Sequence, residues 1–313
     1  MVLETLLPSN VARERPHYMM LIAFLFAIVG MWLAYYVFPN SASILTLAFI
    51  VIAAEPVIRK TLMDEEDEEA KKPGSAATFL GRHFDLIKMY SWFFLGLVLA
   101  YMTWYIILPS GANGGCLAGE YCGNFPTQES VFAEQERQLQ GIGHLRSELS
   151  GNVVATTGNV AQLPRPGDFW GVAGFLFQNN ATVLLLAVFF SFLFGEGALF
   201  LIGWNASIIG TVMGKISSGV ILTSTTNDIW TLFHALGYGI YQGIGFIPHG
   251  IPEIGAYYIG AIAGGIISAS IAKEAYKSHE FRTIAKDAAA LIITAILLLV
   301  VAALIESWLW IGF

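Results

Sequence analysis

Charged side chains are scarce in this sequence. Asp, Glu, Lys and Arg together make up 12% of the 313 residues, whereas a soluble globular domain averages roughly 25%. Hydrophobic residues reach 56%, and the mean hydropathy is +0.63. This composition excludes an ordinary soluble domain. Alternating segments of about ten residues, the pattern of a transmembrane β-barrel, are also missing.

Signatures of soluble catalytic domains are missing as well. The sequence has no glycine-rich phosphate-binding loop, no nucleophile elbow and no long internal repeat. The net charge of −7 comes largely from one acidic run, DEEDEEAKK at 64–72, which we interpret as a solvated linker. We therefore expect no soluble catalytic domain, no cofactor and no nucleic-acid partner.

Long apolar runs dominate what is present. Several of them reach the ~20 residues that a helix needs to cross a bilayer. The sequence therefore predicts an all-α, polytopic transmembrane helical bundle. We place seven spans at 17–38, 42–59, 86–108, 180–193, 198–213, 252–272 and 286–309. The fourth and fifth are short, which favours a tight helical hairpin or a pair of tilted helices.

The distribution of lysine and arginine predicts the orientation of the chain. Twelve of the 16 lie before the first span, between the second and third spans, or between the sixth and seventh. Because such residues concentrate on the cytoplasmic side, we expect a cytoplasmic N-terminus and an extracytoplasmic C-terminus. We divide the chain into an N-terminal two-helix hairpin with the acidic cytoplasmic linker (1–85) and a five-helix core (86–313) that contains an extracytoplasmic loop (109–178).

The extracytoplasmic loop contains both cysteines. Cys116 and Cys122 either form a disulfide, as in an oxidising compartment, or remain free thiols. Further along the loop, apolar residues recur at near-helical spacing, which predicts an amphipathic helix lying on the membrane or on the spans below it; these residues are Val131, Leu139, Ile142, Leu145 and Leu149.

The segment 225–250 is apolar but interrupted by glycines. The predicted topology requires it to begin and end outside the membrane, so we expect a re-entrant or interfacial helix there. Directly after it comes GFIPHGIPEIGAYYIGAIAGG, with Pro248, His249, Gly250 and Glu253 at the start of the sixth span. We expect that span to begin between His249 and Glu253, because proline is common in a first helical turn.

The pair His249 and Glu253 has two interpretations. It forms a helix cap and interfacial anchor, since a carboxylate in a first turn is favoured by the helix dipole. Alternatively, it belongs to a polar cluster that lines an outward-open cavity, since ionisable residues within membranes commonly mark functional sites. Other polar residues that could join such a cluster are Asn179, Asn180, His234, Asn205 and Glu306.

A metal site is a third interpretation of these residues. His249, Glu253 and Glu306, with His234 in reserve, are types that zinc accepts as ligands. Their spacing does not match a known zinc motif, so the sequence favours no metal site. Asn180 and Asn205 are explained as well by hydrogen bonds between helices.

Small residues line two of the predicted spans. They provide faces on which helix backbones approach closely, either within the chain or in a homodimer; the glycines concerned are Gly203, Gly210, Gly260, Gly264 and Gly265.

The order of these elements is similar to that in a known family. An Asn pair, the segment GWNASIIG, the segment PHGIPE and a closing IE in the last span resemble the stage II sporulation protein M family, which has bacterial and archaeal members. The resemblance covers 86–313 and implies a five-helix layout. It assigns the motif to Asn179, Asn180, Gly203, Asn205, Gly210, Pro248, His249, Gly250, Glu253 and Glu306. The two N-terminal spans and the cysteine-bearing loop depart from the sporulation protein.

Taken with the resemblance, the sequence favours a non-enzymatic membrane scaffold or envelope-remodelling component. The family gathers cell-wall hydrolases at the septal membrane in spore-forming bacteria, which implies envelope proteins as partners of the extracytoplasmic loop. We expect a homo-oligomer, such as a dimer, surrounded by membrane lipid. The alternatives are a transporter or channel for a small solute or ion, and a metal-dependent membrane enzyme.

Overall fold

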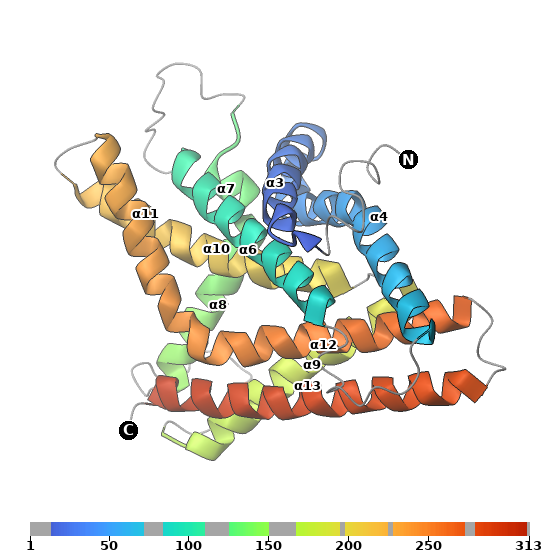
Figure 1. The fold of residues 1–313 in the computed structure, drawn as a ribbon. Helices are drawn as coiled ribbons and strands as arrows, with labels where there is room; N and C mark the ends of the chain where they lie inside the picture. Colours follow the sequence, from blue (N-terminus) through green and yellow to red (C-terminus); the bar gives the residue numbers. More distant parts are fainter. Residues whose placement is uncertain are drawn as a thin grey trace. The chain divides into compact units, whose positions relative to one another are not determined.

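The computed structural model describes residues 14–71, 84–109, 125–149, 167–194, 198–224, 228–272 and 279–311. Every regular element in these ranges is a helix (Figure 1). Seven segments are long and apolar enough to cross a membrane, in agreement with the predicted number of spans. They are Tyr18–Val37, Pro39–Lys60, Phe84–Ile107, Phe169–Phe194, Ala198–Thr223, Ile229–Ile271 and Ile284–Ile311.

The chain forms two compact units that alternate along the sequence. Unit 1 comprises Met1–Thr61, Lys88–Leu139 and Ile202–Gly245; unit 2 comprises Leu62–Ile87, Gln140–Leu201 and Phe246–Phe313. The predicted division of the chain at residue 85 stays a prediction.

Unit 1 is built from α3 (Tyr18–Val37), the start of α4 (Ala42–Lys71), most of α6 (Phe84–Ile107), α7 (Gln128–Val131), the start of α8 (Ala133–Leu149), α10 (Ala198–Thr223) and α11 (Ile229–Gly243). Glycines let its helices approach closely. A Cβ on Gly210 would lie 2.6 Å from the Val98 carbonyl oxygen, and one on Gly214 would lie 2.6 Å from the Tyr105 Cβ. Helix α10 therefore packs directly on the backbone of α6.

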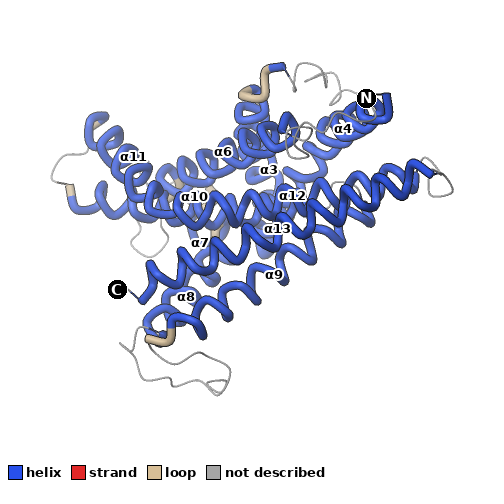
Figure 2. The backbone as a smooth tube through the Cα atoms, turned by 60° about the horizontal axis from the view of Figure 1, so that its bottom comes forward, coloured by secondary structure: helices blue, strands red, loops and turns tan. Residues whose placement is uncertain are grey.

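Unit 2 centres on α9 (Phe169–Phe194), α12 (Ile247–Ala272) and α13 (His279–Ile311), which run alongside one another (Figures 1 and 2). Gly260 contacts Leu184, and four residues later Gly264 contacts Val188, so α9 and α12 are parallel. The Ser307 hydroxyl donates to the Phe169 carbonyl over 2.8 Å, while Ala303 packs on Val172 and Leu176, so α13 is antiparallel to α9.

The fourth and fifth spans are longer than predicted. Helices α9 and α10 have 26 residues each, so neither is a short or half-length helix. The prediction took the pair Asn179 and Asn180 as the start of the fourth span, but Asn180 is buried within α9 and α9 begins at Phe169. The loop predicted to be extracytoplasmic therefore ends about ten residues before 178.

The start of α12 also differs from the prediction. This helix begins at Ile247, so His249 and Glu253 both lie within it, and Pro252 is an interior residue. Pro252 lacks one N–H close to the helix N-terminus, where the loss removes a single bond to the Pro248 carbonyl. A 3₁₀ turn, Ile244–Phe246, connects α12 directly to α11.

Two further segments depart from or extend the sequence analysis. Residues 64–71 of the acidic run predicted as a linker form the end of α4, since Glu, Ala and Lys favour helix. Helix α11 has 15 residues, or about 22 Å, and is too short to cross a ~30 Å hydrocarbon core alone. Cys116 and Cys122 lie outside the described residues.

Candidate functional site

The predicted motif residues His249 and Glu253 lie one turn apart on α12, on the same face. The Tyr257 hydroxyl, on the next turn, donates to Glu253 Oε1 over 2.9 Å. Tyr257 is 1% exposed, so the bond lies in the interior of unit 2. The His249 ring meets the Phe246 ring edge-on, with centroids 6.3 Å apart.

The packing register brings two more predicted residues to this part of unit 2. Gly255 faces Leu298 across antiparallel α12 and α13, which puts Glu306 within about a turn of the level of His249. Glu306 and Glu253 both act electrostatically on Tyr257. The parallel register of α9 and α12 puts Asn180 level with Ala256. His249, Glu253 and Asn180 therefore lie at successive levels along the axis of α12, and Glu306 lies near the level of His249.

Three other predicted residues have different surroundings. His234 is exposed on α11, Asn179 is exposed on α9 and donates to Asn180 Oδ1 over 3.2 Å, and Asn205 is half-buried in unit 1. Across the described ranges, no three His, Cys, Asp or Glu side chains gather closely enough to hold a metal ion.

The glycines predicted as packing positions contact other helices of the same chain. A Cβ on Gly264 would meet the Val188 carbonyl and lie 2.8 Å from the Ser191 Cβ. A Cβ on Gly203 would lie 3.2 Å from Leu47 Cδ2. A Cβ on Gly250 would meet nothing within 4 Å. Packing within the chain therefore accounts for Gly203, Gly210, Gly260 and Gly264.

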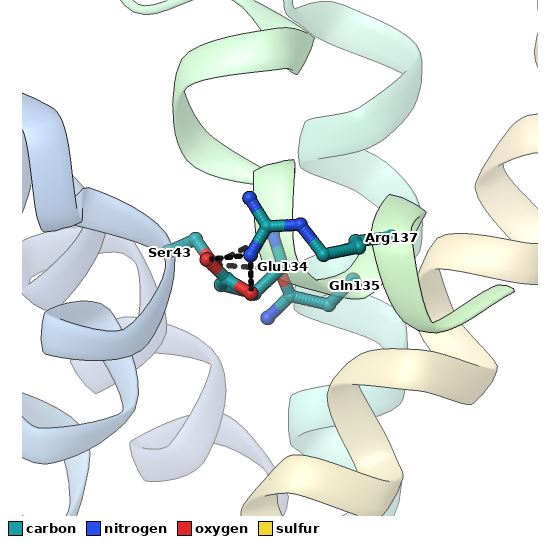
Figure 3. A network of polar contacts seen from close by, with 4 residues as sticks. All are labelled: Ser43, Glu134, Gln135 and Arg137. Atoms are coloured by element: carbon teal, nitrogen blue, oxygen red, sulfur yellow. Dashed lines mark hydrogen bonds and ion pairs between the residues drawn. The ribbon is translucent and has the colours of Figure 1, made fainter. Parts of the chain in front are cut away.

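A second polar cluster, which the sequence analysis missed, lies in unit 1 at the first turn of α8. Gln135 is fully buried there. Its Oε1 accepts from the Ser43 hydroxyl of α4 over 3.1 Å, and its Nε2 donates to Ser207 Oγ of α10 over 3.2 Å. Ser43 Oγ also accepts from the Glu134 backbone N–H, while the Glu134 carboxylate turns to the exposed Arg137 (Figure 3).

The next residue of α8, Glu136, forms a partly exposed ion pair. Lys215 Nζ of α10 donates to Glu136 Oε2 over 2.5 Å, and the Tyr105 hydroxyl of α6 donates to Glu136 Oε1 over 2.5 Å. The Glu136 side chain is 20% exposed and that of Lys215 is 54% exposed. The carboxylate thus connects three helices of unit 1.

Local sequence explains how α8 reaches this position. Thr127 and Ser130 form a capping box that starts α7. Gln128 Nε2 then donates to the Tyr105 and Leu108 carbonyls, which satisfies the free end of α6. The sequence contained one signal for the cluster: Lys215 is the only charged residue in α10, and a charge within a span requires a partner.

A comparison with known protein families gives one match. The family model described as stage II sporulation protein M matches residues 147–309 of the chain. No curated protein and no solved structure matches the chain. The matched region contains α9 to α12 and nearly all of α13, and with them all the motif residues of the sequence analysis.

Proposed function

Because the chain belongs to the stage II sporulation protein M family, whose model covers just over half of it, we propose that it is a non-enzymatic membrane scaffold that takes part in envelope remodelling. With its seven apolar spans it is a multi-pass membrane protein. The proposal includes a homo-oligomer, a cytoplasmic N-terminus and an extracytoplasmic C-terminus.

One observation supports a scaffold above the alternatives: several polar groups of α9, α12 and α13 form hydrogen bonds within the family-matched residues. Tyr257 donates to Glu253, Ser307 donates to the Phe169 carbonyl, and Ser191 accepts from the Ala198 N–H. Glycine contacts bring α9 and α12 together at the same time. Side chains that serve internal packing are suited to a rigid support for partner proteins.

A flux measurement tests the scaffold against transport. The purified protein is reconstituted into vesicles loaded with a set of small ions and solutes, and their release is compared with that from empty vesicles. The scaffold predicts equal release. Protein-dependent release of any solute would overturn it in favour of a transporter.

A crosslinking measurement tests the partner surface. Photoreactive groups are placed at exposed positions of the extracytoplasmic α8 region, such as Arg137, whose side chain is 71% exposed. Envelope proteins are expected to crosslink there, and the matched control at the exposed apolar Leu185 of α9 is expected to give lipid adducts. Crosslinks to lipid alone at both positions would contradict the scaffold.

Transport is the second candidate, and one observation favours it. Lys215 and Glu136 form an ion pair against α10, which is itself long and apolar enough to span the membrane. Ionised residues in such positions commonly line substrate or ion paths. The flux measurement above decides between the two candidates.

A further inference from the structure

The surroundings of the Glu136 carboxylate resemble the binding site of a small anion. Its two oxygens accept from two different helices, one from the Tyr105 hydroxyl of α6 and one from the Lys215 ammonium of α10. Phenol hydroxyls and ammonium groups are donors that recognise free anions in proteins. The two donors belong to the apolar spans α6 and α10, whereas the carboxylate belongs to α8.

A second observation indicates that this region holds more donors than Glu136 uses. The Tyr101 hydroxyl is fully buried and has no hydrogen-bond partner in the described part of the chain. Tyr101 lies one turn before Tyr105 on α6, and both rings pack edge-on against Phe132, with centroids 5.8 and 5.0 Å away. A buried donor without a partner requires an explanation, such as an unseen water or ion.

Helix α10 also carries a hydrogen-bond donor without a partner in the described part of the chain. Ser218 follows Lys215 by one turn, and its buried hydroxyl has no partner among the described residues. Lys215 itself is the only cation of α10. If Glu136 were absent, the ammonium would have no partner in this cluster, and a small anion would restore the charge balance.

We propose that Tyr105, Lys215 and Tyr101 form a binding site for a small monovalent anion, and that the Glu136 carboxylate occupies this site as a tethered anion. The site lies in unit 1. Tyr101, Tyr105 and Glu136 lie outside the family-matched residues, whereas Lys215 lies within them. The proposal does not depend on the scaffold function. Formate and chloride fit the donor set: formate reproduces the carboxylate, and chloride accepts from the same hydroxyl and ammonium groups.

The test is rescue of Glu136→Ala by an added anion. The full-length protein is heated in detergent with sodium formate, sodium chloride or sodium gluconate at equal ionic strength, and its Tm is measured. Wild-type protein is expected to have the same Tm in all three salts. The Glu136→Ala variant is expected to gain about 2–4 °C, saturably, in formate or chloride relative to gluconate.

Matched variants separate the site from general salt effects. Glu134→Ala removes the neighbouring carboxylate, which pairs with exposed Arg137, and is expected to respond equally to the three salts. Adding Lys215→Met to Glu136→Ala is expected to abolish the rescue, and adding Tyr101→Phe is expected to raise the half-saturating anion concentration.

Two results would overturn the proposal. One is a Tm of Glu136→Ala that is the same in formate, chloride and gluconate. The other is a rescue that survives Lys215→Met. If Glu136→Ala does not fold without an anion, the yield of monodisperse protein purified in formate is compared with that in gluconate, and equal failure in both also overturns the proposal.

Discussion

In unit 1 a cluster of polar side chains connects different helices, whereas in unit 2 most of the polar side chains find partners on their own helix. Gln135 and Glu136 of α8 bond to α4, α6 and α10 across up to 92 residues of sequence. Glu253 and Tyr257 are four residues apart on α12, and Asn179 and Asn180 are adjacent. Unit 2 instead relies on close backbone packing at Gly260 and Gly264.

The difference between the units indicates two ways to determine how helices pack against one another in a membrane. Between helices, a polar contact specifies which helices meet and at what register. Small residues specify only that two backbones come close, so the register depends on the fit of the side chains around them. The two units should therefore respond to different substitutions.

The largest expected effect comes from breaking the close packing in unit 2. Gly264→Ala places a Cβ against the Val188 carbonyl and 2.9 Å from the Phe192 nitrogen, neither of which can move freely. We expect the free energy of unfolding to fall by about 1–3 kcal/mol, measured by thermal unfolding in detergent.

The matched control is Gly255→Ala on the same helix. A Cβ there would come no closer than 4.0 Å to Leu298, so the higher helix propensity of alanine is expected to leave stability unchanged or raise it by up to about 1 kcal/mol. Equal destabilisation by both variants would contradict the assignment of Gly264 to the α9–α12 contact.

A smaller effect is expected from the charged contact in unit 1. Lys215→Met or Glu136→Gln leaves the other partner without its counter-charge and should cost about 1–2 kcal/mol, less than for a fully buried pair because Lys215 is 54% exposed. The double variant should cost less than the sum of the two, as a double-mutant cycle on Tm detects. Additive costs would show that the pair is not coupled.

Arg137→Ala, at an exposed pair, should change stability by less than about 0.5 kcal/mol.

The hydrogen bond between Tyr257 and Glu253, within α12, should contribute less to stability than the contacts between helices. Tyr257→Phe removes the bond to Glu253 and is expected to cost about 1 kcal/mol without changing the oligomeric mass in lipid nanodiscs. Tyr241→Phe, at a position that is 67% exposed, should be neutral. A change of mass on Tyr257→Phe would show that the motif organises an interface between copies.

The smallest expected effect lies at the start of α11. The Asp228 carboxylate caps this helix by accepting from the Thr231 N–H over 2.8 Å, and this bond lowers its pKa below the ordinary 3.8. Because the charged form is the one that caps, the stabilisation is present above pH 3.8 and is lost as the pH falls through the lowered pKa. Amide exchange in α11 should therefore accelerate below that pH, after correction for intrinsic exchange. Asp228→Asn keeps a capping side chain and should remove this pH dependence; an unchanged dependence would assign it to another group.

The sequence predicted much of the fold, because apolar runs of span length are a local signal. The seven spans and the amphipathic helix now seen as α8 followed from it. The predicted starts of α9 and α12 were wrong, because the polar Asn179 and the preference of proline for a first helical turn, at Pro252, suggested boundaries that lie inside these helices. The register of α12 and α13 puts Glu306 within about a turn of the level of His249, and its membership of one polar cluster with His249 and Glu253 stays a prediction.

The cluster around Glu136 was missed for a different reason. Its partners are distant in sequence, Lys215 by 79 residues and Ser207 from Gln135 by 72. Nothing local in α8 distinguishes a helix that lies on the membrane from one that is inserted between spans. Lys215 was counted only for orientation, although a lone lysine in α10 required a partner.

The long separation between Glu136 and Lys215 has a consequence for biosynthesis. When α8 leaves the ribosome, α10 has not yet been made, and Gln135 and Glu136 lack their partners Ser207 and Lys215. A segment with an unpaired carboxylate is retained in water because its transfer into lipid is costly. The first turn of α8 is therefore expected to stay outside the bilayer until α10 has been inserted. Unit 1 is then completed when this earlier segment packs against the later one.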